Sequence, residues 1–574
     1  MTPSRFGRLA LVGLLVAACA TSSDNRTAAP SSAAPPPSTA PASAAGSPSI
    51  ACKPSTTPEA KDWNERVWYE VFVRSFSDGN GDGIGDLKGL TAKLDYLNDG
   101  NPATTTDLGI GGIWLMPVFD SPSYHGYDVV DYRKIEQDYG TSADFQALLA
   151  AAHQRGIKVI LDMVLNHTSS QNPWFLDAKA AGSPHDSWYV WSNTNPGYLS
   201  PVGGVAWHPS GGRYYYGVFS DQMPDLNLRN PAVTTELDSI ARFWLDLGVD
   251  GFRLDAGQYL VEDDAKHLTN TPETLAWLAE YKNAVDADKP GAMLVGEVWT
   301  PATTAGKYVP SSLDLDFDFP LADGVRAAIQ GKNAALLNTA LSDTVTAWPP
   351  NQEASFLSNH DQDRIMSQLG GDVPSAKLGA FILMTEPGVP FVYYGEEIGM
   401  QGRKPDEQIR TPMQWSADAP AGGFSTATPW EPLADGWQTT NVAAQTGDPA
   451  SLLSTYRDLI ALRGSTTALR DGGLTLLDDS GADPVTGWLR TTAGQTLLSV
   501  VNVGDQPVSD YGLMLRQGPF CGAQRVTVVA AVGADKGAAV VTPTISALGG
   551  FDAWKPVATL PARSGYLLSI EAAP

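Results

Sequence analysis

The sequence predicts an α/β fold: a (β/α)8 barrel, or TIM barrel, with an inserted domain B after its third strand and a C-terminal antiparallel β-sandwich domain. Eight short runs have the apolar, β-branched and aromatic content of strands, which is the strand count of a closed barrel. Two of them follow an amphipathic helix that ends at a glycine, an order typical of repeated βα units. The alternative is an open doubly wound sheet, but its usual phosphate-binding loop is not present.

The predicted strands alternate with helices along the chain. Residues 141–155 place apolar side chains at helical spacing after a Thr-Ser cap, and Gly156 ends that helix. Asn230-Pro231 opens the helix before the fourth strand, and Gly248 ends it. The eight predicted strands are 67–73, 110–118, 158–164, 252–256, 292–298, 313–319, 354–358 and 390–394.

Length and charge limit the classes of function. At about 150 residues per domain, 574 residues suggest three units once a barrel is counted as one. The 38 basic and 63 acidic residues give a net charge of −25. This charge argues against nucleic acid or anionic lipid headgroups as partners and favours a neutral ligand. The sequence indicates no protein partner.

The amino terminus has the pattern of an export signal. Basic Arg5 and Arg8 precede an apolar run at 9–18, which is too short to span a bilayer of about 30 Å. The Val-Ala-Ala-Cys sequence that ends at Cys19 resembles the bacterial lipobox, in which the cysteine is lipidated and becomes the first mature residue. Residues 1–18 are therefore predicted to be a lipoprotein signal peptide. A simple signal with an accidental cysteine is the alternative.

The predicted product is an exported lipoprotein of a bacterium, anchored to the membrane or cell surface only through its lipid. Residues 19–61 are rich in Ala, Pro, Ser and Thr, cannot bury enough apolar surface to fold, and should form an extended spacer. Apart from Cys19, the sequence contains only Cys52 and Cys521, an even pair in an oxidising compartment. A disulfide between them is a hypothesis.

The folded part is predicted to contain two barrel segments and two further domains. The barrel comprises 62–167 and 231–465, separated by domain B at 168–230. An insertion of this length in a βα loop is uncommon unless it forms a lid or a small domain. From 466 to 574 the chain has short β-like runs, which predict the C-terminal β-domain.

The fourth predicted strand carries a charged pair. Alternation places Phe252 and Leu254 on one face and Arg253 and Asp255 on the other. A guanidinium beside a carboxylate favours its ionised form, which a carboxylate nucleophile requires. A purely structural ion pair at a strand end is the alternative.

Five segments together resemble one enzyme family. They look like the ordered signature regions of the α-amylase family of glycoside hydrolases, family thirteen, and the resemblance runs from about Asp62 into the C-terminal domain. One such motif is weak evidence, whereas five in order are very specific. The segments are Asp162–His167, Met223–Asn227, Gly251–Asp255, Gly296–Trp299 and Ser358–Asp361.

The resemblance implies three catalytic acids. Asp255 corresponds to the nucleophile, Glu297 to the general acid and base, and Asp361 to a carboxylate that binds substrate hydroxyls and stabilises the transition state. Glycosidic cleavage needs two carboxyl groups in different ionisation states. Glu297 follows an apolar run at the C-terminal end of a strand, and burial with Asp255 and Asp361 nearby should raise its pKa.

The resemblance also implies the groups around the sugar bound in the −1 subsite. Tyr127 corresponds to a stacking platform, and His167, Arg253 and His360 correspond to ligands of that sugar. The aromatic side chains of domain B could likewise stack on sugars, but the favoured interpretation of each is the core of the insertion itself.

A glycine-rich loop after the first strand is a candidate metal site. Its oxygen-bearing side chains alternate with glycines, a spacing that suits Ca²⁺, although no EF-hand helices or twelfth-position Glu accompany it. Related amylases and oligoglucosidases hold calcium or magnesium in this loop, so the resemblance implies Ca²⁺ here, with Mg²⁺ possible. The alternative is a loop of Asx turns without metal. The candidate ligands are Asp78, Asn80, Asp82, Ile84 and Asp86.

Two departures bear on the substrate. Amylases usually have Lys-His shortly after the nucleophile, whereas Ala256 follows Asp255 here, so their central calcium is not implied. The run Arg410–Trp415 looks like the oligoglucosidase side of the family, which places the chain in an intermediate group that includes lipoprotein α-amylases.

The sequence therefore predicts a retaining hydrolase of α-1,4-glucans or maltooligosaccharides. The alternatives are an α-glucosidase, an oligo-1,6-glucosidase, a trehalose-forming transglycosylase or, from another class, a non-catalytic glycan-binding lipoprotein. Retention of all three acids argues against the last.

Overall fold

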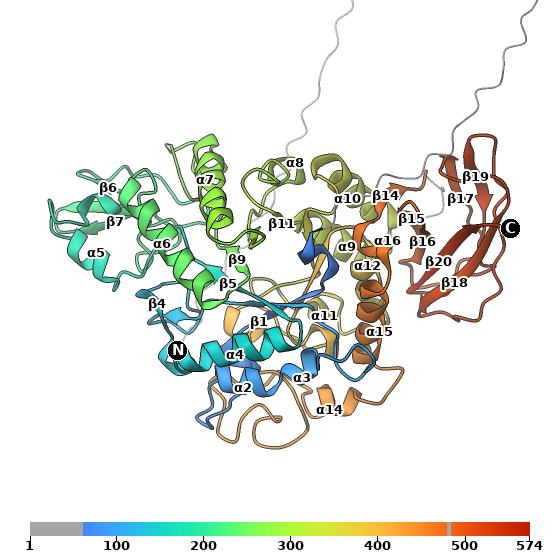
Figure 1. The fold of residues 1–574 in the computed structure, drawn as a ribbon, viewed down its shortest axis with the longest axis horizontal. Coiled ribbons are helices and arrows are strands. Elements are labelled where there is room, and N and C mark those ends of the chain that lie inside the picture. The colour runs from blue at the N-terminus through green and yellow to red at the C-terminus, as the bar shows by residue number, and fades with distance from the viewer. Residues whose placement is uncertain (1–60, 264, 479–483, 574) are drawn as a thin grey trace, which may run out of the picture. The chain divides into compact units, whose positions relative to one another are not determined.

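The computed structural model describes residues 61–263, 265–478 and 484–573, which contain the closed barrel that the sequence predicts (Figure 1). Eight parallel strands form it in the order β1-β13-β12-β11-β10-β9-β5-β2. Each predicted run overlaps one of them, so the predicted fold class is confirmed. The barrel strands are β1 (Trp68–Val71), β2 (Gly112–Leu115), β5 (Lys158–Met163), β9 (Gly251–Leu254), β10 (Met293–Gly296), β11 (Leu315–Phe317), β12 (Glu353–Ser355) and β13 (Val389–Tyr393).

Several strands end before the run that predicted them. β9 ends at Leu254, so Asp255 is the first residue after the strand, and β12 ends at Ser355, before Ser358. These residues enter the loops at the C-terminal end of the barrel, where side chains are free to converge on a ligand. The strand ends thus position the candidate site.

Local sequence explains where the two predicted helices begin and end. The Thr141 hydroxyl accepts from the backbone N–H of Asp144, which caps α4 (Ser142–Gln154). Asn230 caps α6 (Pro231–Leu247), and Gly248 ends it with a φ of 113°. The sequence predicted both helices for these reasons.

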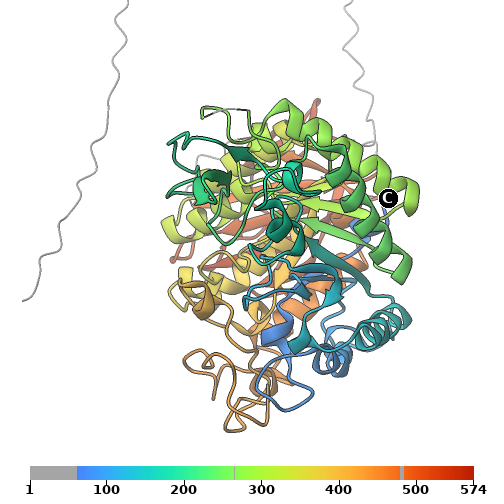
Figure 2. The same cartoon turned by 90° about the vertical axis from the view of Figure 1, so that its left-hand side faces the viewer.

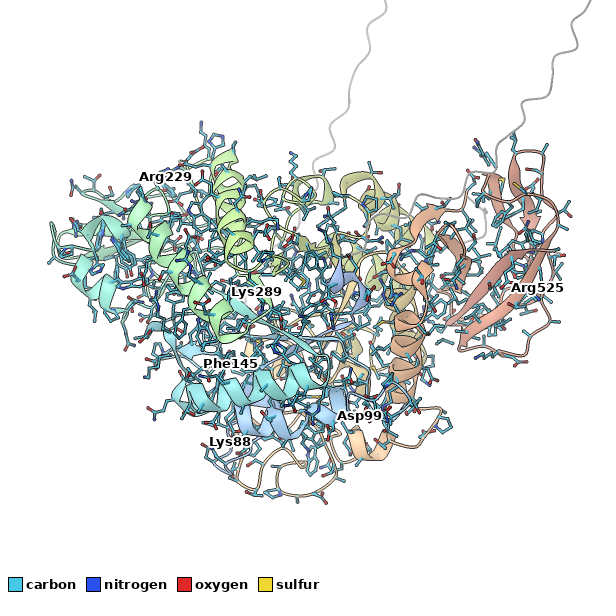
Figure 3. All side chains as sticks on the ribbon, viewed as in Figure 1. Lys88, Asp99, Phe145, Arg229, Lys289 and Arg525 are labelled. Carbon is cyan, nitrogen blue, oxygen red and sulfur yellow. The ribbon has the colours of Figure 1, made fainter. Side chains whose placement is uncertain are left out.

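Helices lie outside the barrel strands in both ribbon views (Figures 1 and 2). Phe145, labelled in Figure 3, packs its ring edge against Trp244 of α6 at a centroid distance of 5.2 Å, which joins α4 to α6. The other long helices are α7 (Pro272–Asp288), α9 (Phe319–Gly331), α10 (Ala334–Ala347), α12 (Val373–Thr385) and α15 (Leu452–Gly464). The short helices are α1 (Val73–Phe76), α2 (Leu87–Ala92), α3 (Leu94–Leu97), α5 (Pro173–Ala178), α8 (Ala302–Ala305), α11 (Ile365–Gln368), α13 (Asp406–Ile409), α14 (Val442–Gln445) and α16 (Thr467–Asp471).

Domain B contains α5 and a three-stranded antiparallel sheet in the order β6-β8-β7. Its strands are β6 (Trp191–Ser192), β7 (Trp207–Ser210) and β8 (Arg213–Tyr216). Its aromatic side chains pack on one another: Phe175 stacks on Trp191 at 5.9 Å, and Trp207 contacts Tyr216 at 5.3 Å. These contacts agree with the interpretation of the aromatic residues as the core of the insertion. Upstream, β3 (Phe119–Asp120) and β4 (Asp131–Ile135) form a separate antiparallel pair.

The C-terminal domain is a β-sandwich. A five-stranded antiparallel sheet, β14-β15-β16-β20-β18, and the pair β17-β19 share one core that includes Leu498, Leu513 and Phe551. The strands are β14 (Gly473–Leu476), β15 (Val485–Thr491), β16 (Thr496–Asn502), β17 (Leu513–Gln517), β18 (Gln524–Val532), β19 (Gly549–Trp554) and β20 (Ser564–Ala572).

Buried side chains of β15 contact the end of α12. The Trp488 indole donates to the Thr385 carbonyl at 3.1 Å. Arg490, fully buried, donates to the carbonyls of Glu386 at 2.5 Å and Gly472 at 2.8 Å. The carboxylate of Glu386 lies in the same buried region, and among the described residues neither of its oxygens has a hydrogen-bond partner.

Several predictions concern residues outside the described ranges. The signal peptide, Cys19, the spacer up to residue 60 and Cys52 all lie there. Cys521 takes part in a disulfide bond, and its pairing with Cys52 stays a prediction. Within the ranges that are described, no helix is both long and apolar enough to cross a membrane.

Candidate active site

A cavity of about 560 Å³ lies at the C-terminal end of the barrel strands. Of the seven side chains predicted to act in catalysis or sugar binding, Tyr127, His167, Asp255, Glu297 and Asp361 line it. Arg253 and His360 are fully buried directly behind this lining. The structure thus brings all seven together, five at the surface of the cavity and two in support.

Arg253 contacts the carboxyl groups of both Asp255 and Glu297. One terminal nitrogen of its guanidinium lies 2.7 Å from Oδ1 of Asp255, and the other lies 2.7 Å from Oε2 of Glu297. The first nitrogen also donates to Oδ1 of Asp162 at 2.9 Å. Arg253 of β9 therefore meets Asp255, the first residue after that strand, on the same side of the chain, as the predicted alternation of side chains requires.

Glu297 lies in surroundings that favour its protonated form. Burial raises its pKa to about 7, and the carboxylates of Asp255 and Asp361 act in the same direction, while Arg253 opposes them. The expected rise of this pKa is thus present in the structure. The backbone N–H of Ala256 also donates to Oε2 of Glu297 at 3.1 Å, and Ala256 has a φ of +54°, an uncommon conformation for a residue other than glycine.

Asp361 is surrounded by cations. Arg410 donates to its Oδ1 at 2.9 Å, and Nε2 of His360 lies 3.0 Å from its Oδ2. Although burial opposes ionisation, these cations hold the pKa of Asp361 well below its usual range. The third acid is therefore ionised at neutral pH.

His360 is charged for the complementary reason. Burial disfavours the imidazolium, but the carboxylates of Asp361 and Glu70 raise its pKa to about 9. Its Nδ1 donates to Oε1 of Glu70 at 2.5 Å. A buried cation thus stands behind the carboxylate of Asp361.

Tyr127 and His167 are the two predicted sugar ligands that line the cavity itself. The Tyr127 ring stacks on that of His360 at 5.7 Å, and its hydroxyl donates to Oδ2 of Asp162 at 3.0 Å. Nε2 of His167 lies 3.1 Å from the carbonyl oxygen of Tyr127, and burial lowers the pKa of His167. His167 is therefore neutral at neutral pH and donates to that carbonyl through Nε2.

Reasoning from sequence assigned no role to several groups of the site. Asp162 and Arg410 belong to segments that were recognised, but nothing in those segments indicates that Asp162 contacts Arg253 and Tyr127, or that Arg410 contacts Asp361. For Glu70, the one sequence feature that could have indicated a role is its acidic side chain within an otherwise apolar predicted strand. Trp299 lines the cavity while 45% exposed, and its place two residues after Glu297 was the available signal.

The carboxylates of the predicted metal loop bind the backbone of the loop itself. Asp78 accepts from the N–H groups of Gly81 and Gly83 at 2.6 and 2.8 Å. Although burial opposes it, the Ser425 hydroxyl and these N–H groups lower the pKa of Asp78. Oδ1 of Asp82 accepts from the N–H of Ile84 at 2.8 Å.

The rest of the loop follows the same pattern. Oδ1 of Asn80 accepts from the N–H of Asp82 at 2.9 Å, and Oδ2 of Asp86 accepts from Gly79 and Asn80 at 3.0 Å. Across the described part of the chain, no three His, Cys, Asp or Glu side chains are grouped so as to hold a metal ion. The loop therefore has the Asx turns of the metal-free alternative, and a cation would have to bind the lone pairs that these carboxylates keep.

The geometry supports one kind of chemistry. The side chain of Asp255 and the carboxyl group of Glu297, whose pKa is about 7, face the same cavity and are bridged by one arginine. Such a pair can supply a nucleophile and a proton to the two sides of a glycosidic bond.

Comparison with known proteins gives a consistent result. The family described as "Alpha amylase, catalytic domain" matches residues 70–472. The chain is 40% identical over 417 residues to Alpha-amylase 3 of Dictyoglomus thermophilum, covering 71% of this chain and 79% of that protein. It is 33% identical over 523 residues to an oligo-1,6-glucosidase of Parageobacillus thermoglucosidasius, covering 77% and 91%. Among solved structures, an alpha-amylase from H. orenii matches with a TM-score of 0.76 and 38% identity, covering 88% of this chain and 99% of that one.

Proposed function

Because the chain belongs to the α-amylase family of glycoside hydrolases, we propose that it cleaves α-1,4-glucosidic bonds of starch or maltooligosaccharides with retention of configuration. The observation that carries this proposal is the Arg253 guanidinium, which joins the carboxylates of Asp255 and Glu297 at 2.7 Å each. Asp255 is the proposed nucleophile, Glu297 the general acid and base, and Asp361 the carboxylate that binds substrate hydroxyls.

The proposed reaction has two steps. In the first, the Asp255 carboxylate attacks the anomeric carbon while protonated Glu297 gives its proton to the leaving oxygen. A covalent β-glycosyl ester on Asp255 results. In the second, the Glu297 carboxylate takes a proton from water, the water oxygen attacks the same carbon, and the ester bond breaks. Two inversions restore the α configuration.

The experiment is an NMR time course of maltotriose hydrolysis by the wild type, Asp255→Asn and Glu297→Gln. We expect the α-anomer of the product first and a fall in kcat of several orders of magnitude for each variant, because both groups act on the transition state. A substrate with a good leaving group should restore the first step of Glu297→Gln but not that of Asp255→Asn. A β-anomer released first would refute the proposal.

The preferred linkage is the finer part of the proposal. In related α-glucosidases a valine directly after the nucleophile accompanies α-1,6 activity, and smaller or polar residues accompany α-1,4 activity, so Ala256 favours α-1,4 bonds. Initial rates on maltotriose, isomaltose, trehalose and pullulan distinguish an α-amylase from an oligo-1,6-glucosidase, an α-glucosidase or a trehalose-forming enzyme. Faster cleavage of isomaltose than of maltotriose would overturn the α-1,4 assignment.

Calcium in the first βα loop remains a proposal. Asp78, Asn80, Asp82, Ile84 and Asp86 would hold the ion through oxygen, the ligand type that Ca²⁺ prefers. The concentration of carboxylates in one short loop supports it, because these charges repel one another without a cation. Bound there, the ion would stabilise the loop.

A lipid anchor at Cys19 is a separate proposal. It rests on the Val-Ala-Ala-Cys sequence and on the Ala, Pro, Ser and Thr composition of the segment that follows. The enzyme would then act at the cell surface of a bacterium, held by its lipid at the end of a spacer.

A further inference from the structure

A buried arginine lies three residues after Asp361 and has no part in the proposed mechanism. Arg364 is 1% exposed, and it is not among the residues that line the cavity. Its Nη1 donates to the Tyr394 carbonyl at 2.7 Å. Within the described residues, its Nε and Nη2 have no hydrogen-bond partner. Because burial of a cation with so few hydrogen bonds costs free energy, the contacts that Arg364 does make call for a physical reason.

The end of β13 surrounds the guanidinium of Arg364. Its central carbon lies 4.4 Å from the centroid of the Tyr393 ring and 4.7 Å from that of Tyr394. Both rings therefore attract the cation through their faces. Burial raises the pKa of Glu396 to about 8, and the charge of Arg364 opposes this rise. The side chain thus interacts with the last residue of β13 and with the residues that follow that strand.

Arg364 joins two loops at the C-terminal end of the barrel. It belongs to the loop after β12, which carries Asp361, whereas Tyr394 lies at the start of the loop after β13. The backbone N–H of Arg364 also donates to the carbonyl of Gly402, further along that second loop, at 3.0 Å. Two hydrogen bonds from one residue therefore fix the distance between the two loops.

This distance bears on the site because the second loop also carries Arg410. Arg410 donates to Oδ1 of Asp361 at 2.9 Å and to the carbonyl of His360 at 3.0 Å. Both contacts run from the loop after β13 to the loop after β12, so a change in the distance between the loops would move the Asp361 carboxylate. A catalytic group has to be held within about 0.5 Å of its productive position, and a misplacement of about 1 Å can lower the rate about a hundredfold.

Stability of the fold is a weak reason for an arginine at this position. Replacement of buried ionic groups by apolar side chains of similar size is often neutral or stabilising. Arg463 provides a comparison, because it is also 1% exposed and also donates to backbone carbonyls, those of Met384 at 3.0 Å and Glu386 at 3.2 Å. These two residues precede β13, so Arg463 lies at the N-terminal end of the barrel strands, opposite the cavity.

We propose that Arg364 is a positioning residue for Asp361, because it fixes the loop after β12 to the loop after β13 and so sets the place of the Asp361 carboxylate in the cavity. This inference rests on the proposed retaining hydrolysis and adds to it a residue that lies outside the cavity. Arg364 does not touch the substrate, and it neither gives nor takes a proton in the reaction. Its effect on the rate passes through Asp361.

The test compares Arg364→Met and Arg463→Met in the full-length enzyme with maltotriose as the substrate. Methionine keeps a long side chain but has neither the charge nor the donors. We expect Arg364→Met to lower kcat about ten- to a hundredfold and to change KM less than about threefold, because Asp361 acts mainly in the transition state. Arg463→Met loses an equally buried guanidinium and should keep the wild-type kcat. Arg364→Lys keeps the cation and a donor for the Tyr394 carbonyl, so its kcat should lie between those of Arg364→Met and the wild type.

A double-mutant cycle tests whether the effect passes through Asp361. Asp361→Asn already removes the carboxylate that Arg364 positions, so adding Arg364→Met to it should lower the residual kcat less than about twofold. Melting temperatures of all variants identify any loss of the fold. A purely structural arginine would lower the melting temperature on substitution and leave the kcat of the folded protein unchanged.

The outcomes separate the two proposals. A wild-type kcat in folded Arg364→Met would overturn the positioning inference and leave hydrolysis standing. The same conclusion would follow if Arg364→Met lowered the kcat of Asp361→Asn as much as it lowers that of the wild type. If Arg364→Met does not fold, Arg364→Lys decides the matter through the same cycle. No consumption of maltotriose by the wild type would overturn both the hydrolase proposal and this inference.

Discussion

Glu70 and His360 are 290 residues apart in the sequence, yet Nδ1 of the histidine donates to Oε1 of the glutamate at 2.5 Å. Both side chains are buried, Glu70 on β1 and His360 in the loop after β12. The bond fixes the imidazole so that Nε2 lies 2.7 Å from the Tyr127 hydroxyl and 3.0 Å from Asp361. Glu70 is therefore a positioning residue, because it acts on the cavity through His360.

Removal of the Glu70 charge should weaken catalysis through His360. A hydrogen bond to a charged group contributes about 1.5 to 3 kcal/mol, so Glu70→Gln should lower kcat about ten- to a hundredfold. It should also lower the pKa of His360 from about 9, because one of the two carboxylates that raise it is gone. An NMR titration of His360 beside the kinetics checks both effects. Glu65→Gln, an exposed site, is the control, and an unmoved His360 pKa would contradict the assignment.

The pH profile should report Glu297. Its pKa is about 7 and its protonated form is the proposed acid, so kcat/KM should fall as the pH rises through about 7. Asp361→Asn removes a negative charge that raises this pKa, and the alkaline limb of its residual activity should move to lower pH. Asp363→Asn removes the same charge two residues away and should leave the limb in place. If the alkaline limb lay at the same pH in the wild type, Asp361→Asn and Asp363→Asn, the titrating group would not be Glu297.

Buried carboxyl groups between the barrel and the C-terminal sheet should make stability depend on pH. Burial raises the pKa of Glu386 to about 8, and Asp318 and Glu353 act in the same direction, while Arg463 and Arg490 oppose them. Because the folded state keeps a proton that the unfolded chain releases above about pH 4.3, this contribution to the free energy of unfolding is complete below that pH. It is lost as the pH rises through about 8.

Glu386→Gln removes this titrating group. Its free energy of unfolding should therefore fall less steeply between pH 5 and pH 8 than that of the wild type, as measured by urea denaturation at several pH values. The slope is the decisive quantity, because the amide changes the absolute stability as well. A variant at an exposed carboxylate, Glu571→Gln, should keep the wild-type slope. Equal slopes for Glu386→Gln and the wild type would exclude Glu386 as the source.

Chelation tests the metal proposal. If calcium binds only the folded loop, EGTA should lower the melting temperature of the wild type, since a ligand of the folded state stabilises it by mass action. Asp82→Ala removes an exposed candidate ligand, and its melting temperature should respond less to EGTA. Elemental analysis gives the metal content directly. If elemental analysis finds no metal and EGTA does not change the melting curve, the metal proposal is wrong, and the loop consists of Asx turns without a bound ion.

The lipid proposal has an equally direct test. Cys19→Ala should release the protein from the membrane fraction or block its maturation, while Cys52→Ala, which leaves the lipobox intact, should not. Fractionation of cells followed by mass spectrometry of the amino terminus measures both. A fully processed Cys19→Ala protein that remains in the membrane fraction would end the claim.

Several features were determined by the sequence alone because their causes are local. The side-chain alternation that placed Arg253 beside Asp255 needs only a strand, and the ends of α6 need only Asn230 and Gly248. The raised pKa of Glu297 followed from an apolar strand and two acids that its resemblance placed nearby. Each of these depends on residues close in sequence or on a recognised motif.

Only the tertiary structure decided which distant groups meet. Closure of the barrel places β13 between β1 and β12, and this closeness lets Glu70 reach His360. The contact between Arg410 and Asp361 arises in the same way from the loops after β13 and β12. No periodicity or motif encodes such contacts, because they are set by the closure of a sheet whose strands lie hundreds of residues apart.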